Sequence, residues 1–118
     1  MLKTIVFDFD GVIHSYDSGW QGYEVIPDEA VEGIEDVLKG LKKKGFKIVI
    51  VSARCIDKDG KEAIESWLKL HGLYDYIDDI TDTKPPALIY IDDRAICFDG
   101  NTKTLMSKIL NFKPWNKK

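Results

Sequence analysis

The sequence contains few of the features that mark a secreted or membrane-spanning protein. Its 118 residues include only two cysteines, Cys55 and Cys97, which do not form a CxxC pair, so we expect both to stay reduced inside a cell. No run of 18 apolar residues is present, which argues against a membrane span. The first residues reach an acidic side chain at Asp8, too early for a signal peptide. We therefore expect a cytoplasmic protein without a membrane partner.

The net charge of the chain is ordinary, and it argues only against a protein with a strongly basic surface for binding polyanions. The formal net charge is −3, so nucleic acid is not indicated as a partner, although the lysines near the end of the chain leave it open. No GxGxxG follows the first apolar run, which argues against a nicotinamide-binding protein. A hydrophobic fraction of 44% is enough for one core, and we expect one domain over residues 1–118. Within it, residues 14–27 form a short flap and residues 112–118 a tail.

Three continuous apolar runs predict strands that are buried on both faces. They cover residues 4–7, 47–51 and 87–91, and none alternates polar with apolar side chains. Shorter strands are expected near residues 76–77 and 95–98. Amphipathic patterns between the runs predict helices, so the rhythm of strand and helix indicates an α/β fold. We expect a three-layer, Rossmann-like arrangement around a central, mostly parallel sheet.

Three segments carry helical patterns. The first has Val31, Ile34, Leu38 and Leu41 on one face, with Asp28 as a candidate N-cap and Gly45 as a stop. The second is expected from about residue 59 to residue 71. The third follows Asn101, and its apolar residues at 105, 106, 109 and 110 are expected to face inward.

Polar residues with side chains suited to catalysis or binding lie next to the ends of the predicted strands. Asp8, Asp10 and Gly11 follow the first run, Ser52 and Arg54 follow the second, Lys84 precedes the third, and Asp92 and Asp93 end it. In an open parallel sheet, ligands bind at the carboxyl ends of the strands. The sequence therefore predicts that these side chains converge on one edge of the sheet.

Each of these residue types suits phosphoryl chemistry. Asp8 can attack phosphorus as a nucleophile, and Asp10 can act as general acid and base. Packed carboxylates repel one another and need a cation such as Mg²⁺, which prefers hard oxygen ligands. Asp8, the backbone carbonyl of Asp10 and one of Asp92 or Asp93 are the candidate metal ligands. Gly11, Ser52, Arg54 and Lys84 are the candidate residues for binding the phosphate of the substrate.

The ordered set of motifs resembles the haloacid dehalogenase (HAD) superfamily. Residues 5–12, with the sequence IVFDFDGV, are similar to its first motif; Ser52 resembles the second, Lys84-Pro85 the third, and Asp92-Asp93 the acidic fourth. The resemblance implies an Mg²⁺-dependent phosphatase that forms an aspartyl-phosphate on Asp8. It also implies Asp10 as acid and base, Ser52 and Lys84 as phosphate binders, and the Asp92/Asp93 pair at the metal, with Asp93 as our preferred direct ligand.

Many members of that family carry a cap domain over the site. Here the flap of residues 14–27 and the stretch between Gly72 and Lys84 are both too short for one, so the chain resembles the capless members. An open site would admit a sugar phosphate, a nucleotide or a phosphate on nucleic acid or protein. It would also suit closure by a second subunit, so a homo-oligomer stays open.

A phospho-signalling or phosphate-binding module without efficient turnover is the alternative. Receiver domains of response regulators also use aspartates, Mg²⁺, a Ser or Thr and a Lys-Pro pair. In those domains the acidic pair comes first, whereas here Lys84-Pro85 precedes Asp92-Asp93 and the candidate nucleophile lies on the first strand. The order of the motifs therefore favours the hydrolase.

Overall fold

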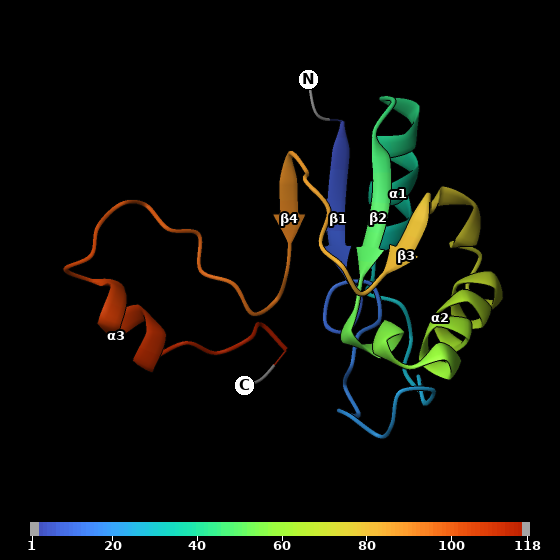
Figure 1. Ribbon diagram of the computed structural model, residues 1–118, viewed down its shortest axis with the longest axis horizontal. Coiled ribbons are helices and arrows are strands. Elements are labelled where there is room, and N and C mark those ends of the chain that lie inside the picture. Colours follow the sequence, from blue (N-terminus) through green and yellow to red (C-terminus); the bar gives the residue numbers. More distant parts are fainter. Residues whose placement is uncertain (1–2, 117–118) are drawn as a thin grey trace.

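A four-stranded parallel sheet forms the centre of the molecule. We describe residues 3–116 from a computed structural model. The strands are β1 (Thr4–Asp8), β2 (Lys47–Val51), β3 (Asp79–Thr81) and β4 (Ile89–Ile91), in the order β3-β2-β1-β4 (Figure 1). Every neighbouring pair is parallel. All carboxyl ends of the strands therefore meet at one edge, as the sequence predicts.

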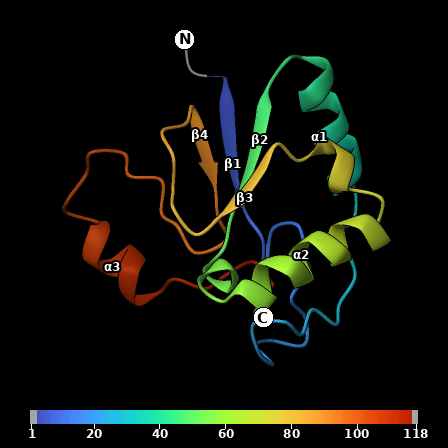
Figure 2. The same ribbon diagram turned by 45° about the vertical axis from the view of Figure 1, so that its right-hand side comes forward.

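Two helices cover one face of this sheet. They are α1 (Ile34–Lys43) and α2 (Lys58–Leu70), and both lie on the same side of β1 and β2 (Figures 1 and 2). Their buried side chains form one core with alternate residues of the strands. The core members of the sheet and helices are Ile5, Phe7, Ile48, Ile50, Ile80, Ile34, Leu38, Ile64, Trp67 and Leu68.

The described chain forms no helix between β3 and β4, where a crossover helix could have covered the opposite face of the sheet. Instead, the connection over residues 82–88 crosses in front of β1 and β2 on its way to β4 (Figures 1 and 2). This connection holds Lys84, whose ammonium nitrogen lies 4.8 Å from the centre of the Tyr90 ring on β4. The Tyr90 hydroxyl donates a hydrogen bond of 2.6 Å to the carbonyl of Pro85. These contacts bring Lys84 back over the sheet.

The architecture confirms the predicted α/β class. Residues 3–116 form a central parallel sheet with helices packed against it and contain no large cap, which is compatible with a Rossmann-like three-layer fold. The 3₁₀ turns Ala53–Ile56 and Tyr74–Tyr76 precede and follow α2. Among the described residues, no helix is long and apolar enough to span a membrane. Residues 117 and 118 of the predicted tail lie outside the described residues.

Several local predictions were wrong. Asp28 does not cap α1, because its carboxylate accepts hydrogen bonds from Ser18, and the helix starts after Gly33 instead. The strand expected near residues 76–77 lies at β3, and no strand forms at residues 95–98, where the chain has turned away from the sheet. Helix α3 (Leu105–Leu110) exists, but its apolar side chains do not face inward: Met106, Ile109 and Leu110 are 66%, 53% and 76% exposed.

Candidate active site

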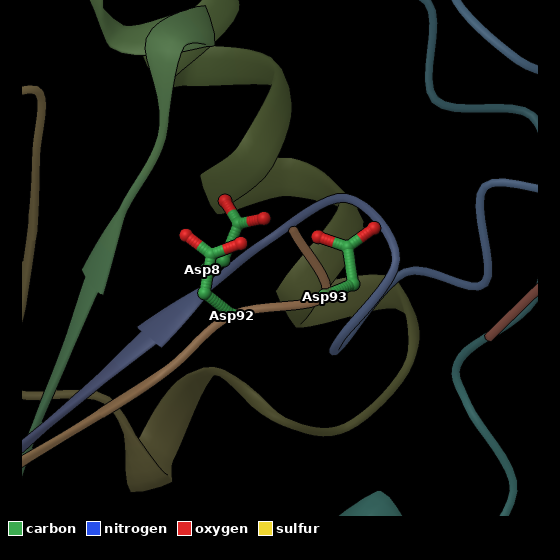
Figure 3. A group of neighbouring side chains, drawn as sticks. All are labelled: Asp8, Asp92 and Asp93. Atoms are coloured by element: carbon green, nitrogen blue, oxygen red, sulfur yellow. The ribbon is translucent and has the colours of Figure 1, made fainter. Parts of the chain in front are cut away.

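Three carboxylates meet at the carboxyl edge of the sheet. Asp8 ends β1, and Asp92 and Asp93 directly follow β4, its neighbour in the sheet (Figure 3). One oxygen from each side chain can be chosen so that all three lie within 4.8 Å of one another. The pairing of β1 with β4 thus joins two motifs that are more than 80 residues apart in the sequence. This part of the predicted convergence is present in the structure.

The surroundings of Asp8 disfavour its negative charge. Burial, a hydrogen bond with the Asp93 side chain and the charges of Asp92 and Asp93 together raise the pKa of Asp8 from 3.8 to about 8. With no cation nearby, Asp8 would therefore hold a proton at neutral pH. A carboxylic acid is a poor nucleophile, so the chemistry expected of Asp8 requires a positive charge close to it.

A divalent cation fits this set of donors. Three carboxylates on two adjacent strand ends offer the hard oxygen ligands that Mg²⁺ prefers, while leaving room in its shell for water and phosphate oxygens. Asp92 is exposed and accepts a hydrogen bond of 2.8 Å from the backbone N–H of Arg94, whereas Asp93 is half-buried and contacts Asp8. The geometry leaves the choice of direct ligand between Asp92 and Asp93 open.

A small hollow joins the carboxylates to the two candidate phosphate binders. Its volume is about 130 Å³, and it lies where β1, β2 and β4 end. Among the residues that line it are Asp8, Ser52, Lys84 and Asp92. Four residues that the sequence analysis selected from four separate segments therefore share one cavity. The connection over residues 82–88 contributes Lys84 to its lining.

Ser52 and Lys84 are positioned by different means. Ser52 is buried; its backbone N–H donates to the carbonyl of Thr81, and its hydroxyl oxygen accepts from the backbone N–H of Arg54. The Ser52 hydroxyl proton therefore remains able to donate to a ligand in the hollow. Lys84 is placed by its position over the Tyr90 ring. One side of the hollow thus carries a positive charge opposite the carboxylates.

Asp10 and Arg54 do not line this hollow, although both were predicted site residues. They form a two-point ion pair, in which Arg54 Nε lies 2.8 Å from Asp10 Oδ2 and Arg54 Nη2 lies 3.1 Å from Oδ1. His14 Nδ1 lies 2.9 Å from the same Oδ1. Burial opposes ionisation of Asp10, but the hydrogen bonds with His14 and Arg54 outweigh it and lower its pKa.

Arg54 also organises the flap. Its side chain is fully buried, and Nη1 donates to the backbone carbonyls of Gly22, Tyr23 and Val25 at 2.8–3.1 Å. Trp20 packs over the guanidinium at 4.8 Å. The flap of residues 14–27 is therefore folded around Arg54. The predicted contact between Arg54 and a substrate phosphate remains a prediction that this arrangement does not favour.

His14 belongs to the same network, and the sequence analysis did not select it. It is fully buried, and its Nε2 accepts a hydrogen bond of 3.1 Å from the backbone N–H of Asp28. An accepting Nε2 places the ring proton on Nδ1, which then donates to Asp10. The spacing of four residues between Asp10 and His14 was the only signal in the sequence, and such a spacing is common by chance.

Gly11, in the loop after β1, occupies a position that has no room for a side chain. Its φ of 82° is in the left-handed region, and a Cβ at this position would overlap Oδ2 of Asp93. Its carbonyl accepts a hydrogen bond of 2.7 Å from the indole N–H of Trp115, near the other end of the chain. Gly11 thus allows the close approach of Asp93 to the loop after β1. Its predicted contact with substrate remains a prediction.

The comparisons with known proteins support the fold but no family. No family model matches the chain, and no curated protein matches it. A crystal structure of an uncharacterized protein from Listeria monocytogenes serotype 4b is similar, with a TM-score of 0.50 and 18% sequence identity. The match covers 93% of this chain and 60% of that protein, so this chain spans about three fifths of its length. At this identity, the similarity concerns the fold alone.

Proposed function

We propose that this protein is a phosphohydrolase that acts on phosphomonoesters, with Asp8 as the covalent nucleophile and Mg²⁺ as the cofactor. The observation that carries the proposal is the shared hollow, in which Asp8, Ser52, Lys84 and Asp92 meet at the carboxyl edge of the sheet. A nucleophile, a hydroxyl donor, an ammonium and a metal-binding carboxylate are the groups that phosphoryl transfer through an aspartyl-phosphate requires.

The reaction would proceed in two displacements. An oxygen of Asp8 forms a bond to phosphorus while the bond from phosphorus to the leaving oxygen breaks, and the leaving group departs as an alcohol after it takes a proton. A water molecule then attacks the same phosphorus, which releases inorganic phosphate and restores Asp8. Each step is a displacement at phosphorus, so no redox partner is needed.

The residues around Asp8 would have separate roles. The Lys84 ammonium and the Ser52 hydroxyl would stabilise the negative charge that builds on the phosphoryl oxygens. Asp8, Asp92 and Asp93, with the backbone carbonyl of Asp10, would hold Mg²⁺. A bound Mg²⁺ would neutralise the carboxylates and bring the phosphate close to Asp8. Because burial and the two neighbouring carboxylates raise the pKa of Asp8, we expect no activity without the metal.

The role of Asp10 as the proton donor to the leaving group requires a separate test. Asp10 is expected to be the acid and base from its motif, yet in this structure both of its oxygens are engaged by Arg54 and His14. Asp10→Asn distinguishes the two roles. A catalytic acid and base is indicated if turnover falls at least about 100-fold with unchanged stability. A structural role is indicated if the free energy of unfolding falls instead.

Phosphate release is the direct test. Wild-type protein, Asp8→Asn and Lys84→Met are assayed with p-nitrophenyl phosphate and a panel of sugar phosphates and nucleotides, with Mg²⁺ and with EDTA. We expect release by the wild type in Mg²⁺ only, none by Asp8→Asn and strongly reduced release by Lys84→Met. Wild-type rates in Asp8→Asn, or full activity in EDTA, would refute the mechanism.

Incubation with acetyl phosphate, followed by intact-protein mass spectrometry and a phosphate-release assay, distinguishes the signalling alternative. Acetyl phosphate would phosphorylate a receiver domain on its acceptor aspartate and leave a long-lived adduct, detectable as a mass increase of the intact protein. A hydrolase would instead release inorganic phosphate over many turnovers. A stable adduct on Asp8 without multiple turnovers would favour the signalling module.

A further inference from the structure

The segment after the candidate metal site projects from the body of the molecule. We call residues 94–113 the arm; it leaves the sheet after β4, carries α3 at its far end and then returns (Figures 1 and 2). Among the described elements, none makes a substantial packing contact with α3. The radius of gyration is 15.0 Å, whereas a compact chain of this length has about 13.5 Å. The arm accounts for the extended shape.

Both ends of the arm are attached to the body. It starts directly after Asp93, and beyond its other end Trp115 donates a hydrogen bond to the carbonyl of Gly11. The side-chain amide of Asn116 donates to the carbonyl of Ser15 at 3.1 Å. These two contacts span more than 100 positions of the sequence. The arm is therefore a loop held at its base, not a free terminus.

The exposed surface of the arm is apolar. Leu105 and Ile109, and likewise Met106 and Leu110, are one helical turn apart, so the four form one stripe on α3. Leu105 is half-buried, whereas Met106, Ile109 and Leu110 are exposed, as are Phe98 and Phe112. A six-residue helix has no stability of its own in water. Its apolar stripe thus requires a surface to pack against.

A groove of matching character lies on the body. It has a volume of about 320 Å³ between α1 and the edge strand β4, on the helix-covered side of the sheet. The lining is mainly apolar and consists of Phe7, Val12, Val31, Ile34, Val37, Ile91 and Trp115, with Gly11, Asp92 and Asp93 at one end. Val37 in this lining and Ile89 on the edge strand β4 are each about half exposed. Exposed apolar side chains along an unpaired edge strand mark a docking surface.

The charges of the arm and the groove are complementary. The arm contains four basic residues, Arg94, Lys103, Lys108 and Lys113, and one acidic residue, Asp99, which pairs with Lys108 at 3.4 Å. Residues 31–37, which supply three residues of the groove lining, contain Glu32, Glu35 and Asp36 and no basic residue. The arm is therefore basic, while the mainly apolar groove has Asp92 and Asp93 in its lining and acidic residues in the segment that supplies Val31, Ile34 and Val37. The two surfaces are self-complementary, as an interface with twofold symmetry requires.

We propose that two copies of this chain exchange arms, with α3 of each copy packed into the groove between α1 and β4 of the other. The two contacts would be equivalent by symmetry. Since the arm begins directly after Asp93, docking would also fix the segment that carries two of the candidate metal ligands. This inference is independent of the proposed activity.

Sedimentation velocity of the full chain over a range of concentrations tests the proposal. We expect a dimer that dissociates on dilution. Ile109→Glu on the arm and Val37→Glu in the groove should each weaken dimerisation at least about tenfold, which corresponds to about 1.4 kcal/mol. Both side chains are about half exposed, so the folded monomer should tolerate the changes. Leu70→Glu is the matched control, because Leu70 is 82% exposed on α2 and should leave the dimer intact.

Mixing the two interface variants separates arm exchange from other arrangements. A mixture of Ile109→Glu and Val37→Glu can form a heterodimer with one intact arm and one intact groove, so association should be partly restored. A monomeric wild type, whether its arm is free or folded onto its own groove, would overturn the proposal. A dimer that neither variant weakens, or that mixing does not restore, would overturn it as well.

Discussion

Arg54 holds both carboxylate oxygens of Asp10, with Nε 2.8 Å from Oδ2 and Nη2 3.1 Å from Oδ1. The pair joins the loop after β1 to the turn after β2, and the same guanidinium binds three carbonyls of the flap. One buried cation therefore fixes the first motif and the flap together. The ion pair therefore gives both residues a structural contact, in addition to the site roles that the sequence analysis predicts for them.

Removal of this cation should destabilise the fold. Arg54→Met leaves the half-buried Asp10 without its cationic partner and with His14 alone, and the loss of one partner of a buried ion pair costs up to about 3–5 kcal/mol. We expect the free energy of unfolding in urea to fall by about this amount. Arg94→Met is the control, because Arg94 is exposed and should change stability by no more than about 0.5 kcal/mol. Equal stability of the two variants would contradict the structural role.

Gly11→Ala should lower the Mg²⁺ affinity of the candidate metal site, in addition to lowering the stability of the fold. A Cβ there overlaps Oδ2 of Asp93, and the positive φ adds a strain of about 1–2 kcal/mol. Gly33→Ala is a matched control, since Gly33 has a φ of 83° and nothing lies within 4 Å of the point that its Cβ would occupy. We expect both variants to lose stability, but only Gly11→Ala to lose Mg²⁺ affinity by isothermal titration calorimetry. Equal Mg²⁺ affinity in the two variants would show that Asp93 is not displaced.

The strands and the site edge could be predicted from the sequence because they rest on short-range patterns. Continuous apolar runs predict buried parallel strands, and parallel strands bring their carboxyl ends together. That was sufficient to place Asp8, Ser52 and Asp92 near one another, whereas Lys84, which precedes the third run, was selected from the order of the motifs. It required no knowledge of a specific side-chain contact.

The features that the sequence did not predict depend on partners distant in the sequence. Arg54 and Asp10 are 44 positions apart, and no periodicity indicates that they form an ion pair. The pattern of α3 correctly predicts a helix with one apolar face, but it does not reveal which surface that face packs against. Residues 95–98 have the composition of a strand, yet the chain leaves the sheet after Asp93, so they have no neighbouring strand to pair with.

The stability of the metal-free protein should fall as the pH rises from about 4 to about 8. The pKa of Asp8 is raised from 3.8 to about 8 in the folded protein, so the folded state binds a proton in this range that the unfolded state has lost. Asp8 therefore contributes stability that is fully present below about pH 4 and is lost as the pH rises through about 8. Calorimetric melting in EDTA at several pH values measures this trend.

Two comparisons identify Asp8 as the source of that trend. Asp8→Asn removes the titrating group and should flatten the dependence of melting temperature on pH over this range. Mg²⁺ should stabilise the wild type most at the high end of the range, where the carboxylates are ionised and the repulsion is greatest. A wild type and an Asp8→Asn variant with the same pH dependence in EDTA would show that another group is responsible.

Trp115→Phe should loosen the contact between the end of the chain and the first motif. The substitution keeps an aromatic ring in the groove but removes the indole N–H that donates to the Gly11 carbonyl at 2.7 Å. One such hydrogen bond contributes about 0.5–1.5 kcal/mol, so we expect a small loss of stability. Amide hydrogen exchange should show a larger change, with faster exchange at residues 11–15 and in the arm.

Trp20→Phe is the control, because Trp20 packs over Arg54 in the flap without an indole hydrogen bond to Gly11, and exchange in the arm should stay as in the wild type. Unchanged exchange in the arm of Trp115→Phe would mean that its base is held by other contacts, with Asn116 and the carbonyl of Ser15 as the next pair to disrupt.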